Sequence, residues 1–190
     1  MKLFKFILVL FVAVSFSSCS EDPKEPTILL SNANIAGVHG INSFNIDTKV
    51  TSETDVLGVS VPLEIATSSG YGDTFQIDFE LTENGDYTLI GQYRLISNIT
   101  PAGGSQVSET SILLVDDSGT YEIDTTNNTI TFTSSLDALL DFSLDASSRL
   151  SGTFNVVTFN ETAIVLRQEK EEVLEAMTTQ IKTNIRFERN

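Results

Sequence analysis

The stretch FQIDFELTENGDYTLIGQYRLI, residues 75–96, decides the fold class of this 190-residue chain. Its first half alternates apolar with polar residues, and the apolar ones share one face: Phe75, Ile77, Phe79 and Leu81. A period of two is typical of a β-strand with one buried face. Asn84-Gly85 is a strong signal for a hairpin turn, and the alternation resumes at Tyr87. The stretch therefore predicts two antiparallel strands joined by a short turn.

Strand and turn signals recur through most of the chain. VSETSILLV (Val107–Val115) predicts a strand, DDSG (Asp116–Gly119) a turn, and GTYEID–TTNN–TITFT a hairpin over 119–133. A further hairpin is predicted over 149–168. The chain has no Trp and is rich in Thr, Ser, Val, Ile and Phe, a composition that favours β-structure. Turns at this spacing predict an antiparallel meander that forms a barrel or a sandwich.

Three segments depart from this pattern. QEKEEVLEAMTTQ (Gln168–Gln180) predicts a helix with Val173, Leu174 and Met177 on its apolar side. The strand IKTNIRFER (Ile181–Arg189) follows it and is expected to pair with the first strand near Ile41–Ile46. Residues 51–73 are interpreted as a long connection with a possible strand near 59–65. Residues 134–148 are ambiguous, and we favour a helical turn that leads into a strand.

Residues 1–18 have the form of a signal peptide. Two lysines precede the apolar run FILVLFVAVSF, which is too short to span a membrane. FSSC (Phe16–Cys19) resembles the lipobox of bacterial lipoproteins, with Phe16 where Leu is commonest. We therefore expect cleavage before Cys19, the only cysteine of the chain, and acylation of its thiol and freed amine. Several acyl chains would anchor the protein stably to a membrane.

Residues 19–32 are expected to form a lipidated tether, followed by one domain over 33–190. The acidic stretch SEDPKEP (Ser20–Pro26) resembles a surface-export signal of some lipoproteins. The expected location is the outer membrane, with the protein lipid-anchored at Cys19 and exposed at the cell surface. A net charge of −15 argues against nucleic acid as a partner. We expect a monomer whose membrane contact is the anchor.

The order of elements resembles that of bacterial lipocalin-like lipoproteins over roughly residues 33–188. FELTENGDYTL (Phe79–Leu89) and SGTYEIDTTNNTITFT (Ser118–Thr133) match the hairpins of that family, and IAGVHGI (Ile35–Ile41) matches its start. The resemblance implies an all-β, antiparallel up-and-down barrel of about eight strands. It also implies one C-terminal helix before the last strand.

The family resemblance gives His39 a structural role. This residue stands where the family has a Trp that packs under an Arg of the last strand, for which Arg186 and Arg189 are candidates. His39 is also the only histidine, so a Ser-His-Asp site would depend on it. We therefore expect no catalytic residues, and the absence of metal and phosphate-binding motifs predicts no cofactor and no metal site. Asp116 and Asp117 are interpreted as a solvated turn rather than a calcium site.

What remains is binding. A barrel of about eight strands can hold one small ligand among its inward side chains. Five aromatic residues have the phase to point inward, either as core or as the lining of a pocket: Phe79, Tyr87, Tyr93, Phe132 and Phe154. The sequence thus favours an anchored lipocalin-like protein that binds a small apolar or amphipathic ligand. The alternative is a structural or interaction lipoprotein with a filled barrel, whose loops contact a protein or a glycan.

Overall fold

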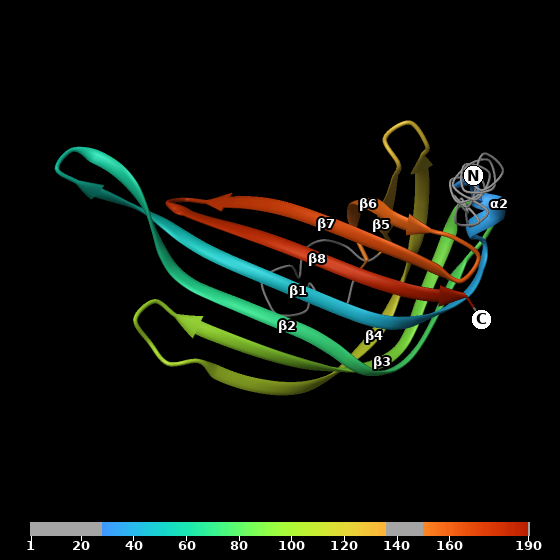
Figure 1. The fold of residues 1–190 in the computed structure, drawn as a ribbon, viewed down its shortest axis with the longest axis horizontal. Coiled ribbons are helices and arrows are strands. Elements are labelled where there is room, and N and C mark those ends of the chain that lie inside the picture. The colour runs from blue at the N-terminus through green and yellow to red at the C-terminus, as the bar shows by residue number, and fades with distance from the viewer. Residues whose placement is uncertain (1–27, 136–149, 190) are drawn as a thin grey trace, which may run out of the picture.

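The computed structural model describes residues 28–135 and 150–189. Within them the chain forms a closed antiparallel barrel, in which each strand pairs with the next and β1 pairs with β8 (Figure 1). The strands are β1 (Gly37–Val56), β2 (Val59–Leu81), β3 (Asp86–Pro101), β4 (Val107–Asp124), β5 (Thr129–Ser134), β6 (Gly152–Phe159), β7 (Ala163–Leu174) and β8 (Met177–Arg189). A four-residue helix, α2 (Asn32–Ile35), precedes them. The prediction of an all-β up-and-down barrel of about eight strands is confirmed.

The ends of the chain close the barrel as expected. Ile41 pairs with Phe187 and Ile46 with Thr183, so the last strand lies beside the first. Ile35 of α2 is buried and helps to cover the end of the barrel at which β1 begins and β8 ends (Figure 1). Leu30 is buried as well, so the last residues of the expected tether, 28–32, already contact the barrel.

The predicted helix over 168–180 is wrong. These residues form the ends of β7 and β8 and the tight turn between them, where Glu175 has a φ of 56°. The charged residues that suggested a helix face cross-strand partners instead: Lys182 forms an ion pair with Glu169, and Gln180 donates to Glu171. Leu174, expected to be buried under a helix, is exposed. Pairing along two long strands outweighs the local helical preference, because eleven residues form only a marginal helix alone.

Two loops predicted from the sequence are also strands. Residues 51–73 belong to β1 and β2, which meet in a turn at Leu57-Gly58 rather than in a long connection. Asp116–Gly119, predicted as a turn, lies within β4, which runs unbroken from Val107 to Asp124. The polar and glycine residues that suggested a turn are accommodated because β5 approaches very closely there. A Cβ atom at Gly119 would lie 2.0 Å from the carbonyl oxygen of Thr133.

Gly91 marks a bend, as the sequence predicts for a glycine in mid-strand. Its φ is +145°, and a Cβ atom there would lie 2.0 Å from the carbonyl oxygen of Gln76. Opposite it, β2 has a bulge between Asp73 and Gln76, and the two backbones approach each other. Only glycine satisfies both the conformation and the contact. The bend lets β2 and β3 curve around the barrel.

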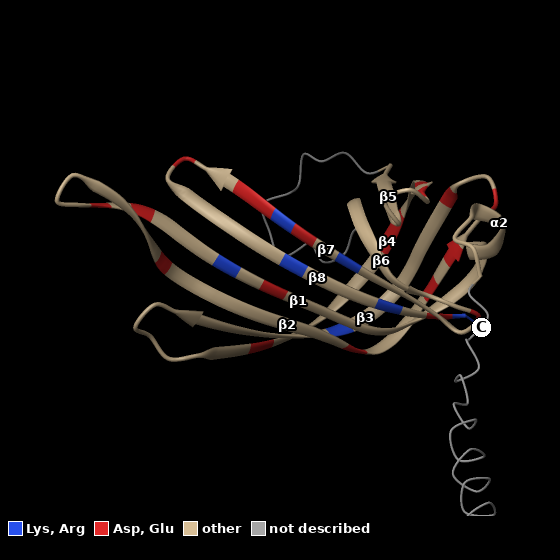
Figure 2. Cartoon of the chain, turned by 45° about the horizontal axis from the view of Figure 1, so that its top comes forward, with Lys and Arg blue, Asp and Glu red and all other residues tan. Residues whose placement is uncertain are grey.

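The two faces of the sheet differ in polarity. Inward positions of β2 such as Ile77, Phe79 and Leu81 are buried, whereas the outward Gln76, Asp78 and Glu80 are exposed. Charged residues of both signs are distributed along the strands (Figure 2). In the described part of the chain, no helix has the length and apolar character that a membrane crossing requires. The signal peptide, Cys19 and most of residues 134–148 lie outside the described residues.

Candidate functional site

Unequal strand lengths divide the barrel interior into two halves. β5 has 6 residues and β6 has 8, whereas β1 has 20 and β2 has 23. All strands contribute to the end near α2, which we call the packed half. The hairpins β1–β2, β3–β4 and β7–β8 continue beyond β5 and β6 and form the open half (Figure 1).

The packed half is filled by aromatic side chains. Phe79 lies at its centre, with ring centroids 4.6 Å from Phe187, 6.1 Å from Phe132 and 6.3 Å from Tyr87. Phe132 also contacts Phe154 edge to face at 5.9 Å. The structure thus brings together four of the five aromatic residues predicted to point inward, and all are buried. Contact at these spacings makes this cluster the hydrophobic core.

The fifth predicted residue, Tyr93, lies at the boundary between the halves. Its ring stacks on Phe75 at 5.7 Å and meets Phe44 edge to face at 5.8 Å. Gly72 leaves the space that Phe75 occupies, since a Cβ atom there would lie 2.8 Å from the Phe75 ring. These aromatic rings lie at the base of the open half, and we call the surface that they form the floor. A role of the predicted aromatic residues in ligand binding stays a prediction.

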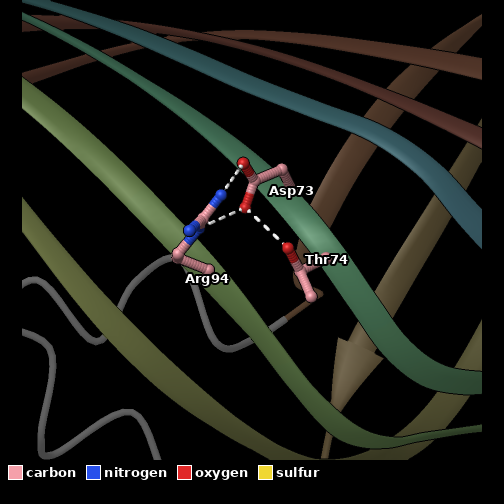
Figure 3. A network of polar contacts seen from close by, with 3 residues as sticks. All are labelled: Asp73, Thr74 and Arg94. Atoms are coloured by element: carbon pink, nitrogen blue, oxygen red, sulfur yellow. Dashed lines mark hydrogen bonds and ion pairs between the residues drawn. The ribbon is translucent and has the colours of Figure 1, made fainter.

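An ion pair on the outer face holds the bulge that presents Phe75. Arg94 of β3 donates two hydrogen bonds of 2.6 Å to the Asp73 carboxylate, and Thr74 donates a third (Figure 3). The hydrogen bond from Arg94 is the main reason why the pKa of Asp73 is lowered. Thr74 has a φ of 52°, the left-handed conformation that lets the strand gain extra residues there. The bidentate pair therefore fixes the local geometry that turns Phe75 inward.

Asp117 is a carboxylate buried inside the packed half. It accepts hydrogen bonds from the hydroxyl of Tyr87 at 2.9 Å, the backbone N–H of Leu150 at 2.9 Å and the hydroxyl of Ser134 at 2.5 Å. Burial, followed by these contacts with Asp117, raises the pKa of Tyr87 far above its usual range. The Asp117 carboxylate thereby links β3, β4 and β5 to Leu150, the first described residue before β6.

Asp117 was missed in the sequence because the DDSG pattern suggested a turn. Its parity with Leu113, Val115 and Tyr121 was the signal that could have placed it inward. Asp116 points to the opposite face and is exposed, so the two carboxylates cannot share a calcium ion. Across residues 28–135 and 150–189, no three side chains of His, Cys, Asp or Glu gather closely enough to hold a metal.

His39 is fully buried against the aromatic core. Its Nε2 lies 2.8 Å from the carbonyl oxygen of Ile35, which it bonds as a donor, and its ring lies 6.2 Å from that of Phe79. Among the described residues, none forms a hydrogen bond with its Nδ1 atom. Burial lowers the pKa of His39, and the nearby charge of Arg189 acts in the same direction. These contacts support the structural role that the sequence predicts.

The register also separates the two arginines considered as its partner. Arg189 lies directly opposite His39 on β8, whereas Arg186 points outward and forms an ion pair with Glu188. Of the two arginines, Arg189 is therefore the one that lies beside His39.

The open half has a largely apolar inner face. Ile46 and Leu113 pack against the edge of the core, and Leu95 is buried beside them. Farther out, the register places more apolar side chains on the same face, and these are exposed: Val56, Val59, Val61, Leu63, Leu174 and Met177. Exposed apolar residues on the inner wall of a barrel mouth are a feature of a binding surface.

Polar groups of β7 interrupt this apolar surface. Gln168, Lys170 and Glu172 have the inward parity of buried Leu166, and Gln168 donates to the carbonyl oxygens of Ser151 and Thr153. Lys170 lies next to Gly152 and forms no ion pair with any described residue. The open half therefore combines an apolar floor with a polar wall that carries one unpaired ammonium group. The sequence did not single out this lysine, because the segment was predicted to be a helix.

Comparisons with known proteins give little support for a family. The chain matches no protein-family model, and no curated protein matches it. Among solved structures, it is similar to Ail, the attachment invasion locus protein of Yersinia pestis, in complex with the heparin analogue sucrose octasulfate. The match has 8% sequence identity and a TM-score of 0.23, and it covers 81% of this chain and 99% of Ail. At that TM-score we base no functional argument on it.

We predict that Asp117→Ala lowers the free energy of unfolding by about 3 kcal/mol, because it leaves the buried N–H of Leu150 without its acceptor and removes the carboxylate that Tyr87 and Ser134 also bond. Asp116→Ala, one residue away on the exposed face, is the matched control and should change it by less than about 0.5 kcal/mol. Urea unfolding followed by circular dichroism measures both values. Equal effects would contradict the burial of Asp117.

We predict that His39 makes the fold less stable in acid. Its pKa is near 6.5 in the unfolded chain and lower in the folded one, so below pH 6.5 the unfolded chain binds a proton that the folded one does not. The free energy of unfolding therefore decreases as the pH is lowered from 6.5, until the pKa of His39 in the folded protein is reached. His39→Phe should reduce this loss between pH 7 and 5, as measured by urea midpoints at each pH. Identical slopes for the two proteins would show that His39 is not held neutral.

Proposed function

We propose that the protein binds a small amphipathic molecule in the open half of its barrel. The observation that carries this proposal is the apolar floor of Phe75, Tyr93 and Leu113, which faces the mouth above a filled core. The apolar part of the ligand would cover this floor, and its polar group would lie near Lys170. Burying apolar area in this way contributes about 25 cal/mol per Å². The proposed role is binding rather than catalysis, by a monomer.

The packed half lends support to an alternative in which the whole barrel is a filled scaffold. In that case the protein would be a structural or interaction lipoprotein that meets its partner through its loops. The two functions differ in whether the inner face of the open half binds a ligand. The experiment below distinguishes them at that face.

The probe is 1-anilinonaphthalene-8-sulfonate, an aromatic anion that fluoresces when it enters an apolar site. We expect Leu113→Asp to weaken its binding at least tenfold, because the substitution places a negative charge on the apolar floor, where it repels the sulfonate. Leu114→Asp is the matched control, since Leu114 is the next residue on the outer face and is 75% exposed. Both variants should melt cooperatively near the temperature of the parent protein before their binding is compared.

Lys170→Gln should weaken binding of the same probe severalfold, because the ammonium group on the polar wall would pair with its sulfonate. If the Leu113 and Leu114 variants bind the probe equally, its site lies elsewhere and the proposed function fails. If the parent protein gives no increase in the fluorescence of the probe, the result argues for the filled scaffold instead.

We further propose that the protein is attached by lipid at Cys19 to the outer membrane and displayed at the cell surface. The support is the lipobox-like FSSC sequence and the position of Ile28, which lies near Thr125, Asn128 and Phe159 at the packed end. An anchor there would leave the open half facing away from the attachment point. Cys19→Ala should abolish incorporation of an alkyne-labelled fatty acid and shift the protein out of the membrane fraction. Retention of label in this variant would refute the anchor.

A further inference from the structure

The outer face of the open half carries a groove that the proposed function does not use. It has a volume of about 460 Å³ and crosses β8, β1, β2 and β3, with Gln106 from the turn before β4 at one end. Every residue that lines it is polar or charged: Asp47, Thr48, Lys49, Thr67, Ser68, Ser69, Asn98, Thr100, Gln106, Gln180 and Lys182. This polarity separates the groove from the apolar inner face on the other side of the same strands.

The strand register arranges most of these side chains in two rows across the sheet. One row runs through Lys182, Asp47, Ser69 and Asn98, and the other through Gln180, Lys49, Thr67 and Thr100. Neighbouring positions in a row are directly paired residues, whose side chains lie about 5 Å apart on one face. The groove therefore presents a regular grid of hydroxyl, amide and carboxylate groups on a rigid sheet.

The charges of this grid are already largely balanced. Lys49 lies 3.1 Å from Glu64, and Lys182 lies 3.6 Å from Glu169, so each ammonium group has a carboxylate partner. Figure 2 shows the resulting mixture of basic and acidic positions along β1 and β8. A groove with paired charges offers hydrogen bonds without a strong field. This favours an uncharged ligand over a polyanion.

Internal hydrogen bonds fix the direction of at least one amide. Asn98 Oδ1 accepts from Gln106 Nε2 at 3.0 Å and from Ser108 Oγ at 2.6 Å. The side-chain N–H groups of Asn98 make no hydrogen bond within the described part of the chain and are left to donate to a ligand. Together with the acceptor Asp47 and the hydroxyls around it, they suit a ligand that both donates and accepts at closely spaced positions.

An exposed aromatic ring lies on the same face beside this grid. Tyr71 is 43% exposed and follows Ser69 by two residues on β2, between Asn45 and Ile96 on the neighbouring strands. A tyrosine ring offers an apolar surface with a polar end. We propose that the groove binds a neutral oligosaccharide, whose hydroxyls bond the two rows and whose C–H face packs on Tyr71. This site is formed by strands rather than by loops and is independent of the inner face.

The test is binding of the purified protein to an array of immobilised neutral and acidic glycans, with titration calorimetry against the neutral glycan that binds best. We expect at least one neutral oligosaccharide to bind with a Kd below about 1 mM. The double variant Asn98→Ala/Gln180→Ala should weaken that Kd at least tenfold. Tyr71→Ala should weaken it severalfold.

The matched control is Gln76→Ala/Gln92→Ala. These two residues form an exposed amide pair on the outer face of β2 and β3, with Gln92 Nε2 2.7 Å from Gln76 Oε1, outside the groove. This control should leave the Kd unchanged, and so should Leu113→Asp on the inner face. Binding to no neutral glycan, binding to sulfated or carboxylated glycans only, or equal loss in the control would each overturn the proposal. A loss in Leu113→Asp alone would overturn it as well, by assigning the glycan to the inner face.

Discussion

Pairing between β1 and β8 is the interaction on which the rest of the structure depends. It joins residues near the two ends of the described chain, such as His39 and Arg189, and leaves the sheet without a free edge in the packed half. Contacts of such long sequence separation are entropically costly to form. Here the closing strand also brings Phe187 of β8 against Phe79 of β2, so the closure of the barrel also completes the aromatic core. The aromatic core exists only inside the closed ring.

The sequence predicted the strands that show a clear alternation of apolar and polar residues beside a clear turn signal. The hairpin at Asn84-Gly85 and the inward residues from Ile77 to Leu81 needed only a period of two and a turn signal. It did not predict the β7–β8 hairpin, because the glutamates and Lys170 carry a helical preference that pairing with Lys182 and Gln180 overrides. The DDSG stretch was wrongly predicted to be a turn, although it lies within a strand. Its glycine serves the close approach of β5, a contact that no local pattern records.

The candidate sites also contain features that the sequence could predict and features that it could not. Inward aromatic residues such as Tyr93 could be found by parity alone, whereas their separation into core and floor could not, since it depends on where β5 and β6 end. The buried Asp117 required knowledge that Tyr87, Ser134 and Leu150 converge on it. Likewise, the outer groove is a property of register. Asp47, Ser69 and Asn98 lie far apart in the sequence and become neighbours only when three strands are aligned.

The difference in strand length explains why stability and binding can be separated in this barrel. In the packed half every strand contributes side chains, and the space between them is filled, so substitutions there act on the fold. In the open half the hairpins extend past β5 and β6, and their side chains have no opposing wall to pack against in the described structure. Residues such as Leu63 and Met177 therefore stay exposed without being needed for the core. A sheet held rigid at one end thus presents two surfaces of different chemistry at the other, an apolar floor inside the barrel and a polar groove outside it.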